Sequence, residues 1–154
     1  MGRENRPNNQ RNQVNQFPVA ENLKEKFSNP NFSFSNYEIE ELIKDCKKFG
    51  EELANNRFKM AQLRKFHSHF TKIWTFLSSQ SKTKEEKFNE VKPQIQFSKV
   101  YLAYQAARNR GDAYSEFEGV ISALIDKVGS YEDFEKLKKF IDALVAYHKY
   151  HGGD

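Results

Sequence analysis

Apolar side chains recur every three or four residues along one segment of the chain, residues 58–80. This spacing places them on one face of an α-helix and leaves polar side chains on the other face. The apolar face comprises Met60, Leu63, Phe66, Phe70, Ile73, Trp74 and Leu77. Because this face is long and rich in large side chains, the pattern predicts a helix around which the others pack, with Trp74 in the core.

Helical periodicity also runs through most of the remaining chain. The predicted helices span residues 36–53, 58–80, 93–111, 112–129 and 131–151, with a short helical turn over 83–91. The start signals are capping boxes formed by Ser35 with Glu38 and by Thr83 with Glu86, the pair Ser130 and Asp133, a capping Asp112, and Pro93 at a first helical position. No stretch shows sustained strand alternation. The chain is therefore predicted to be all-α, a compact bundle of about five helices.

The first 34 residues differ from this bundle. Residues 1–16 contain five Asn, three Gln and three Arg with almost no apolar side chain. Such a segment cannot bury enough surface to offset the entropy cost of ordering, so we expect a disordered tail. Residues 17–34 hold scattered Phe and two Pro, which indicates an irregular and weakly packed arm. We expect the helical bundle domain to occupy residues 35–154, after a tail and arm at 1–34.

Composition narrows the class of protein further. Fourteen Phe and seven Tyr among 154 residues are typical of a packed protein rather than a disordered one. The single Cys46 excludes an internal disulfide and any zinc site built from several cysteines, and we expect it to be an inert core thiol. No apolar run approaches ~20 residues and no signal peptide is evident, so no membrane association is predicted and a cytoplasmic location is expected.

Charge is distributed unevenly along the chain. No acidic residue lies between Glu52 and Glu85. The cations of this acid-free stretch are Arg57, Lys59, Arg64, Lys65, Lys72, Lys82 and Lys84. Without neighbouring anions they create a field that attracts polyanions. The alternative is a solvated basic face balanced by acidic helices elsewhere, and helix 36–53 is expected to expose Glu38, Glu40, Glu41, Asp45, Glu51 and Glu52.

A second acid-free stretch lies between Glu90 and Asp112. Its cations are Lys92, Lys99, Arg108 and Arg110. The last two lie at the predicted C-terminus of a helix, where positive charge interacts favourably with the helix dipole, so a purely structural role is also open to them.

No catalytic or metal site is predicted. His67 and His69 are two residues apart and point to different sides of a helix, so they cannot hold one metal ion together. His148 and His151 are three apart, which suits metal ligation, but no third ligand is evident and we expect them to decorate a helix end. The chain also lacks a glycine-rich phosphate loop and the common hydrolase motifs. We therefore predict neither enzyme activity nor a cofactor.

Aromatic residues are interleaved with the basic stretches, a pattern typical of single-strand nucleic-acid binders. These residues are Phe66, Trp74, Tyr101 and Tyr104. Most of them sit at core-type spacing, so we expect them in the core rather than stacked on bases. Phosphate contacts, which carry no sequence information, remain as the main predicted interaction.

Three blocks of sequence resemble a known family. In order, residues 61–66 (AQLRKF), 102–108 (LAYQAAR) and 143–150 (ALVAYHKY) are similar to the small helical subunit of type III-A CRISPR effector (Csm) complexes. The resemblance covers roughly residues 35–153 and leaves out the Asn- and Gln-rich tail at residues 1–16.

The resemblance implies a non-catalytic RNA-binding role in antiviral defence. Such subunits stack as a short filament of identical copies along the guide (crRNA) and target RNA duplex, beside the other Csm complex subunits. It implies that Gln62, Arg64, Lys65 and Arg108 face RNA. The acid-free stretches add Lys59, Lys72 and Arg110 to this expected site.

Two alternatives stay open. The chain could be a structural adaptor that bridges protein subunits with only incidental RNA contact. It could also be a free-standing nucleic-acid-binding bundle unrelated to CRISPR.

Overall fold

The computed structural model describes residues 15–78, 81–109 and 111–154, and all regular structure in these residues is helical. The elements are α1 (Pro18–Ser28), the 3-10 turn η1 (Phe34–Asn36), α2 (Ile39–Asn55), α3 (Met60–Ser78), α4 (Lys84–Arg108), α5 (Asp112–Ile125) and α6 (Tyr131–Tyr150). The predicted all-α class is confirmed, with six α-helices in the described residues against about five expected. Residues 1–14 of the expected tail, and Arg110, lie outside the described residues.

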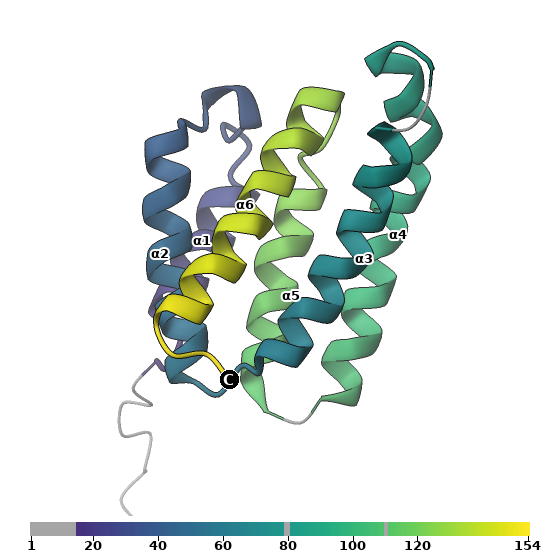
Figure 1. Cartoon of the computed structure of the whole chain (residues 1–154). Helices are drawn as coiled ribbons and strands as arrows, with labels where there is room; N and C mark the ends of the chain where they lie inside the picture. Colours follow the sequence, from purple (N-terminus) through teal and green to yellow (C-terminus); the bar gives the residue numbers. More distant parts are fainter. Residues whose placement is uncertain (1–14, 79–80, 110) are drawn as a thin grey trace, which may run out of the picture.

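The helices form two layers of three. In one layer α6 packs between α2 and α3, and in the other α5 packs between α1 and α4. Figure 1 shows α2 and α3 on opposite sides of the molecule with α6 between them. The α3–α4 pair therefore forms one side of the bundle, away from α2.

The apolar face predicted for α3 is buried as expected, with one exception. Leu63, Phe66 and Phe70 are fully buried, and Phe70 contacts the ring of Phe134 on α6. Trp74 is only half-buried, and it packs against the core at Tyr131 and Phe134, so the expected core position of Trp74 holds only in part.

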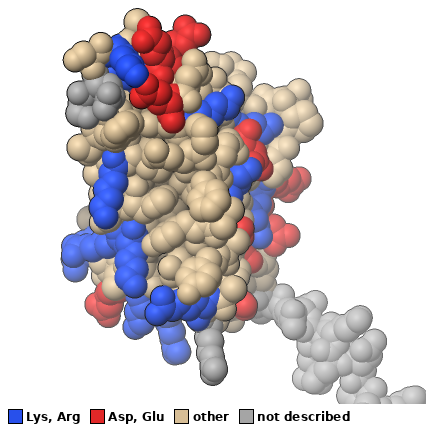
Figure 2. Space-filling view, turned by 90° about the vertical axis from the view of Figure 1, so that its right-hand side faces the viewer, with Lys and Arg blue, Asp and Glu red and all other residues tan. Residues whose placement is uncertain are grey.

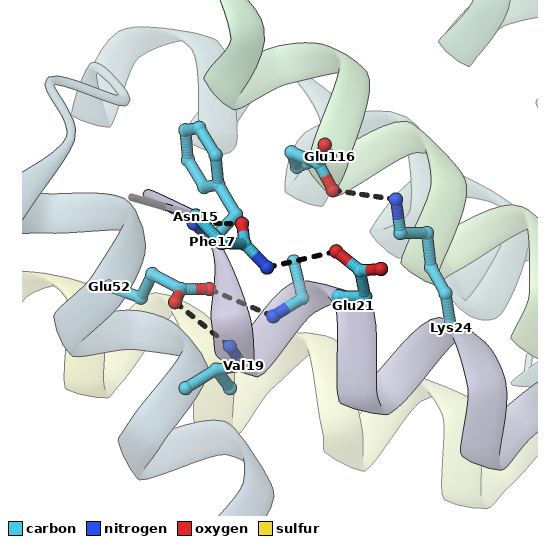
Figure 3. A network of polar contacts seen from close by, with 8 residues as sticks. Asn15, Phe17, Val19, Glu21, Lys24, Glu52 and Glu116 are labelled. Carbon is cyan, nitrogen blue, oxygen red and sulfur yellow. Dashed lines mark hydrogen bonds and ion pairs between the residues drawn. The ribbon is translucent and has the colours of Figure 1, made fainter. Parts of the chain in front are cut away.

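The arm expected to be irregular is a helix over most of its length. In α1, Ala20, Leu23 and Phe27 are buried. Glu52 of α2 caps its N-terminus: the Val19 N–H donates to Glu52 Oε1 at 2.9 Å and the Ala20 N–H to Oε2 at 2.8 Å (Figure 3). A carboxylate is favoured there because the first N–H groups of a helix lack partners and carry partial positive charge.

This arrangement corrects a second expectation, since Glu52 was predicted on the outer face of its helix and is instead buried. The salt bridge between Lys24 and Glu116, with Nζ and Oε2 2.7 Å apart, further ties α1 to α5 (Figure 3).

Helix α2 begins three residues later than predicted. Ser35 lies in η1, Tyr37 has an extended backbone, and Ile39 is the first helical residue. Lys136 of α6 explains the delay, because its ammonium group donates to the carbonyls of Phe34 (2.6 Å) and Tyr37 (2.8 Å). These carbonyls are thus satisfied outside a helix, and the predicted Ser35–Glu38 capping box does not form.

Helix α4 is continuous where a break was predicted. Pro93 lies inside it and is exposed. Its missing N–H costs one intrahelical hydrogen bond. Val91 and Ile95 on either side are fully buried, so packing holds both halves in one helix.

The other predicted helix ends have mixed outcomes. Thr83 caps α4 by accepting from the Glu86 N–H at 3.2 Å, and Ser130 caps α6 by accepting from the Asp133 N–H at 3.1 Å, as expected. Asp112 is the first residue of α5 rather than its cap, and α5 ends at Ile125, before Gly129.

Candidate nucleic-acid interface

The start of α3 is joined to the end of α4. The Gln62 side chain donates to Asn109 Oδ1 at 2.6 Å, and its own oxygen accepts from the Lys59 N–H at 3.0 Å. Gln62 therefore caps the N-terminus of α3, as the Glu or Gln of a capping box does, and also links α3 to the end of α4. Much of its hydrogen-bonding capacity is used inside the protein.

A groove runs between the two helices. Its larger part has a volume of about 440 Å³ and is lined by Ala61, Arg64, Lys65, Ser68, His69, Lys72 and Tyr101. Its smaller part has a volume of about 130 Å³ and is lined by Ala61, Gln62, Lys65, Gln105, Arg108 and Asn109. Both parts are bordered by Ala61 and Lys65, so they adjoin, and we call them together the basic groove. Figure 2 shows Lys and Arg side chains gathered toward the lower left of the face that contains α4.

Four cations of the basic groove lie free of acidic partners. Arg64, Lys65, Lys72 and Arg108 are all exposed. Among residues 15–78, 81–109 and 111–154, none of the four forms an ion pair. Other lysines are neutralised by nearby carboxylates: Lys24, Lys26, Lys82, Lys99 and Lys138. The groove therefore keeps an uncompensated positive field that favours an anionic ligand.

The floor of the groove is an aromatic pair. The rings of His69 and Tyr101 are stacked, with their centroids 4.7 Å apart and an angle of 1° between their planes. Ser98 donates to the Gln94 carbonyl at 3.1 Å, so its oxygen is available to accept from His69 Nε2 at 2.9 Å. Burial, and secondarily the charge of Lys72, lower the pKa of His69, which keeps the ring neutral near pH 7. His69 is thus a neutral structural part of the groove floor.

The remaining expected site residues lie around this groove or outside the described chain. Lys59 is exposed just before α3 begins, whereas Arg110 is among the residues the structure does not describe. The sequence interpretation missed Ser68 and Gln105, whose residue types give no signal for a binding surface. It also placed Tyr104 in the core, which is wrong, since Tyr104 is 63% exposed.

His148, His67 and Cys46 make contacts within the protein fold. His148 was expected to decorate a helix end and is instead fully buried, with Nε2 2.6 Å from the Phe58 carbonyl oxygen. His67 contacts Asp142 on α6 at 2.8 Å. Cys46 is buried, its thiol contacts the Phe140 carbonyl at 3.3 Å, and burial raises its pKa. In the described part of the chain, no three His, Cys, Asp or Glu side chains lie close enough to hold a metal ion.

Comparison with protein-family models gives a match over residues 36–154, more than half of the chain, to the family described as Csm2 Type III-A. The chain belongs to this family. Csm2 Type III-A proteins are structural, generally non-catalytic small subunits of the type III-A CRISPR effector complex, and membership in the Csm complex implies other subunits as partners. Searches of curated proteins and of solved structures each found no match.

The Csm2 match begins within η1 and so includes α2 to α6, leaving α1 outside. It contains the entire basic groove. No helix among the described residues is long and apolar enough to cross a membrane.

Proposed function

We propose that this chain is a non-catalytic RNA-binding subunit that holds the sugar–phosphate backbone of the guide or target RNA in the basic groove. The observation that carries this proposal is the set of four exposed cations without acidic partners, Arg64, Lys65, Lys72 and Arg108, on the walls of one groove. Lysine and arginine side chains contact phosphate regardless of base identity. Such contacts suit a subunit that must accept any guide sequence.

The distribution of charge supports stacking of identical copies along the RNA. Helix α3 carries cations and no acidic residue, whereas α2, on the opposite side of the bundle (Figure 1), exposes Glu40, Glu41 and Glu51 together with Lys44, Lys47 and Lys48. The carboxylates of α2 in one copy are suitable partners for the α3 cations of the next copy in a head-to-tail contact, which repeats as a filament when rotation does not close it. We propose a short filament of this kind within the antiviral complex.

The test is the salt dependence of RNA binding by the full chain. If each copy neutralises about three phosphates of a single strand, the slope of log affinity against log salt is roughly −2, at about −0.7 per phosphate. The double variant Arg64→Ala/Lys65→Ala removes two contacts and should take roughly 1.4 from the magnitude of the slope. RNA of every sequence should be weakened alike.

A matched control is available on α2. Lys47 and Lys48 are also adjacent and exposed, but they lie away from the groove. Lys47→Ala/Lys48→Ala should leave the slope close to that of the parent, and circular dichroism should show both variants folded. An unchanged slope in the folded Arg64/Lys65 variant would reject the groove as the RNA site and favour the structural adaptor.

A further inference from the structure

Helix α4 carries large apolar side chains on its outer surface. Phe97 is 69% exposed, Val100 53% and Tyr104 63%. Figure 2 shows a broad uncharged surface with protruding rings beside the basic side chains. Among the described residues, no ring contact involves Phe97 or Tyr104, whereas other aromatic side chains of the bundle pack in pairs. These two rings thus remain available to a ligand.

Helix geometry places the two rings along the rim of the basic groove. At 3.6 residues per turn, Phe97, Tyr104 and Arg108 fall within roughly 40° of one another around the α4 axis. Tyr101 lies on the same side of α4, and both Tyr101 and Arg108 line the groove. Neither Phe97 nor Tyr104 is among the residues that line the groove, so both rings lie on its outer rim along α4.

The opposite wall supplies charge over a similar length. Arg64 and Lys72 on α3 are separated by about 12 Å along the helix, and Phe97 and Tyr104 on α4 by about 10 Å, at 1.5 Å per residue. A ligand lying along the groove thus meets cations on one side and aromatic faces on the other over the same distance. A single nucleic-acid strand carries both the phosphates and the flat apolar rings that such walls fit.

The floor pair cannot supply the stacking surface. Tyr101 is half-buried, and His69 already covers one face of its ring at 4.7 Å. A protein partner fits less well than RNA, because covering the rim would also desolvate Arg108, which has no acidic partner in the described chain.

We propose that Tyr104 and Phe97 form a base-stacking platform for unpaired nucleotides of the RNA whose phosphates lie in the basic groove. This inference rests on the proposed RNA binding and adds to it a contact with the bases. Stacking of this kind tolerates every base, because each has an aromatic face. It therefore remains compatible with binding independent of sequence.

The experiment compares two RNAs that carry equal charge. One is a mixed-sequence single strand of about 12 nucleotides, within the site sizes usual for single-strand binders, and the other is the same strand with abasic sugars. The full chain should bind the strand with bases at least ~5-fold more tightly, the lower end expected for stacking on one ring. Tyr104→Ala and Phe97→Ala should each remove a factor of about 5 for that strand and leave affinity for the abasic strand unchanged.

Two further measurements separate stacking from other effects. Tyr104→Phe keeps the ring and should keep the affinity, and none of these variants should alter the salt slope, since no phosphate contact is lost. Tyr150→Ala is the matched control, because Tyr150 is 77% exposed but lies at the end of α6. It should bind both RNAs as the parent does.

The outcomes distinguish this inference from the proposed function. Equal affinity of the parent for the two RNAs, with a normal salt slope, would overturn the stacking platform and leave phosphate binding intact. Loss of affinity for both RNAs in the Tyr104→Ala variant would also overturn it. Absence of salt-dependent binding to either RNA would reject the proposed function itself. If Tyr104→Ala instead weakens binding of a Csm subunit and spares both RNAs, the exposed apolar side chains of α4 form a protein contact, which would also overturn the stacking platform.

Discussion

At the scale of single residues, three buried polar side chains in the described part of the chain each contact a group on a different element. Glu52 of α2 caps α1, Ser98 of α4 supports His69 of α3, and His148 of α6 contacts the Phe58 carbonyl ahead of α3. Such groups are costly to bury without partners, so each contact selects one arrangement of neighbouring helices.

Substitution of Glu52 tests this view. Glu52→Ala should lower the free energy of unfolding by about 1–3 kcal/mol, because it removes two charge-assisted hydrogen bonds to the N–H groups of Val19 and Ala20. The measurement is chemical denaturation followed by circular dichroism. Glu51→Ala, at the exposed neighbouring position, should change stability by less than about 0.5 kcal/mol. Equal effects of the two substitutions would contradict the capping role.

His148 gives the protein a dependence on pH. Burial lowers the pKa of His148, with the nearby charge of Lys149 acting in the same direction and the hydrogen bond to the Phe58 carbonyl opposing it. Its Nδ1 is buried and has no hydrogen-bond partner among the described residues, so a proton there would be unsatisfied. Below the ordinary histidine pKa of about 6.5, the unfolded chain therefore binds more protons than the folded chain.

Stability should consequently fall as the pH is lowered through about 6.5. We expect His148→Gln, which keeps a donor for the Phe58 carbonyl, to lose less stability than the parent between about pH 7.5 and pH 5.5. Urea denaturation at both pH values measures the difference. A parent-like pH dependence of the His148 variant would exclude this residue as the cause.

At the scale of elements, α1 shows how a segment with a weak sequence signal becomes part of the core. Phe27 is fully buried and its ring contacts those of Phe32, Tyr37 and Phe140. These contacts join α1 to the segment before α2 and to α6. The segment between the tail and α2 therefore stabilises the bundle instead of lying loosely on it.

Removal of the Phe27 ring measures how much α1 contributes. Phe27→Ala should cost about 3–5 kcal/mol, the usual range for a fully buried phenylalanine. Glu25→Ala, exposed on the same helix, should stay within about 0.5 kcal/mol of the parent. Thermal and urea denaturation both report this difference. A loss below about 1 kcal/mol for Phe27→Ala would contradict this role of α1 and support the sequence-based expectation of a weakly packed arm.

At the scale of the whole molecule, the two-layer bundle places α3 and α4, which carry the groove cations, on the side away from α2 (Figure 1). Within residues 15–78, 81–109 and 111–154, the fold brings no comparable concentration of reactive groups together. His69 is held by Ser98, His148 is buried, and Cys46 is a buried thiol. The groove has the chemistry of a binding surface, with cations and neutral rings.

We therefore expect the purified full chain to leave single-stranded RNA intact, with or without added divalent ions. Gel analysis of labelled RNA over long incubation measures this. Cleavage that follows the protein through purification and disappears in a His67→Ala variant would contradict the proposed non-catalytic role. Cleavage that persists in that variant should be traced to a contaminant by comparison with a mock purification.

The amino-acid order alone was enough for several features of the protein. Apolar spacing predicted the existence of α3 and the burial of Leu63 and Phe66, because period 3.6 is a local property of the chain. The caps at Thr83 and Ser130 are also local, since each hydroxyl reaches an N–H three residues ahead. The run of cations without acids was visible directly, as was the resemblance to the small Csm subunit.

Other features arise only when distant segments pack. Arg108 and Lys65 line the same part of the basic groove because α3 and α4 lie antiparallel. No local sequence pattern specifies this packing of two helices. Apolar side chains at helical spacing, such as Trp74 and Tyr104, are buried only as far as a neighbouring helix covers them. Glu52 has the sequence signature of a surface carboxylate and is buried because α1 presents its free N–H groups there. Exposure and hydrogen bonding between helices depend on packing partners, and these partners lie far away along the chain.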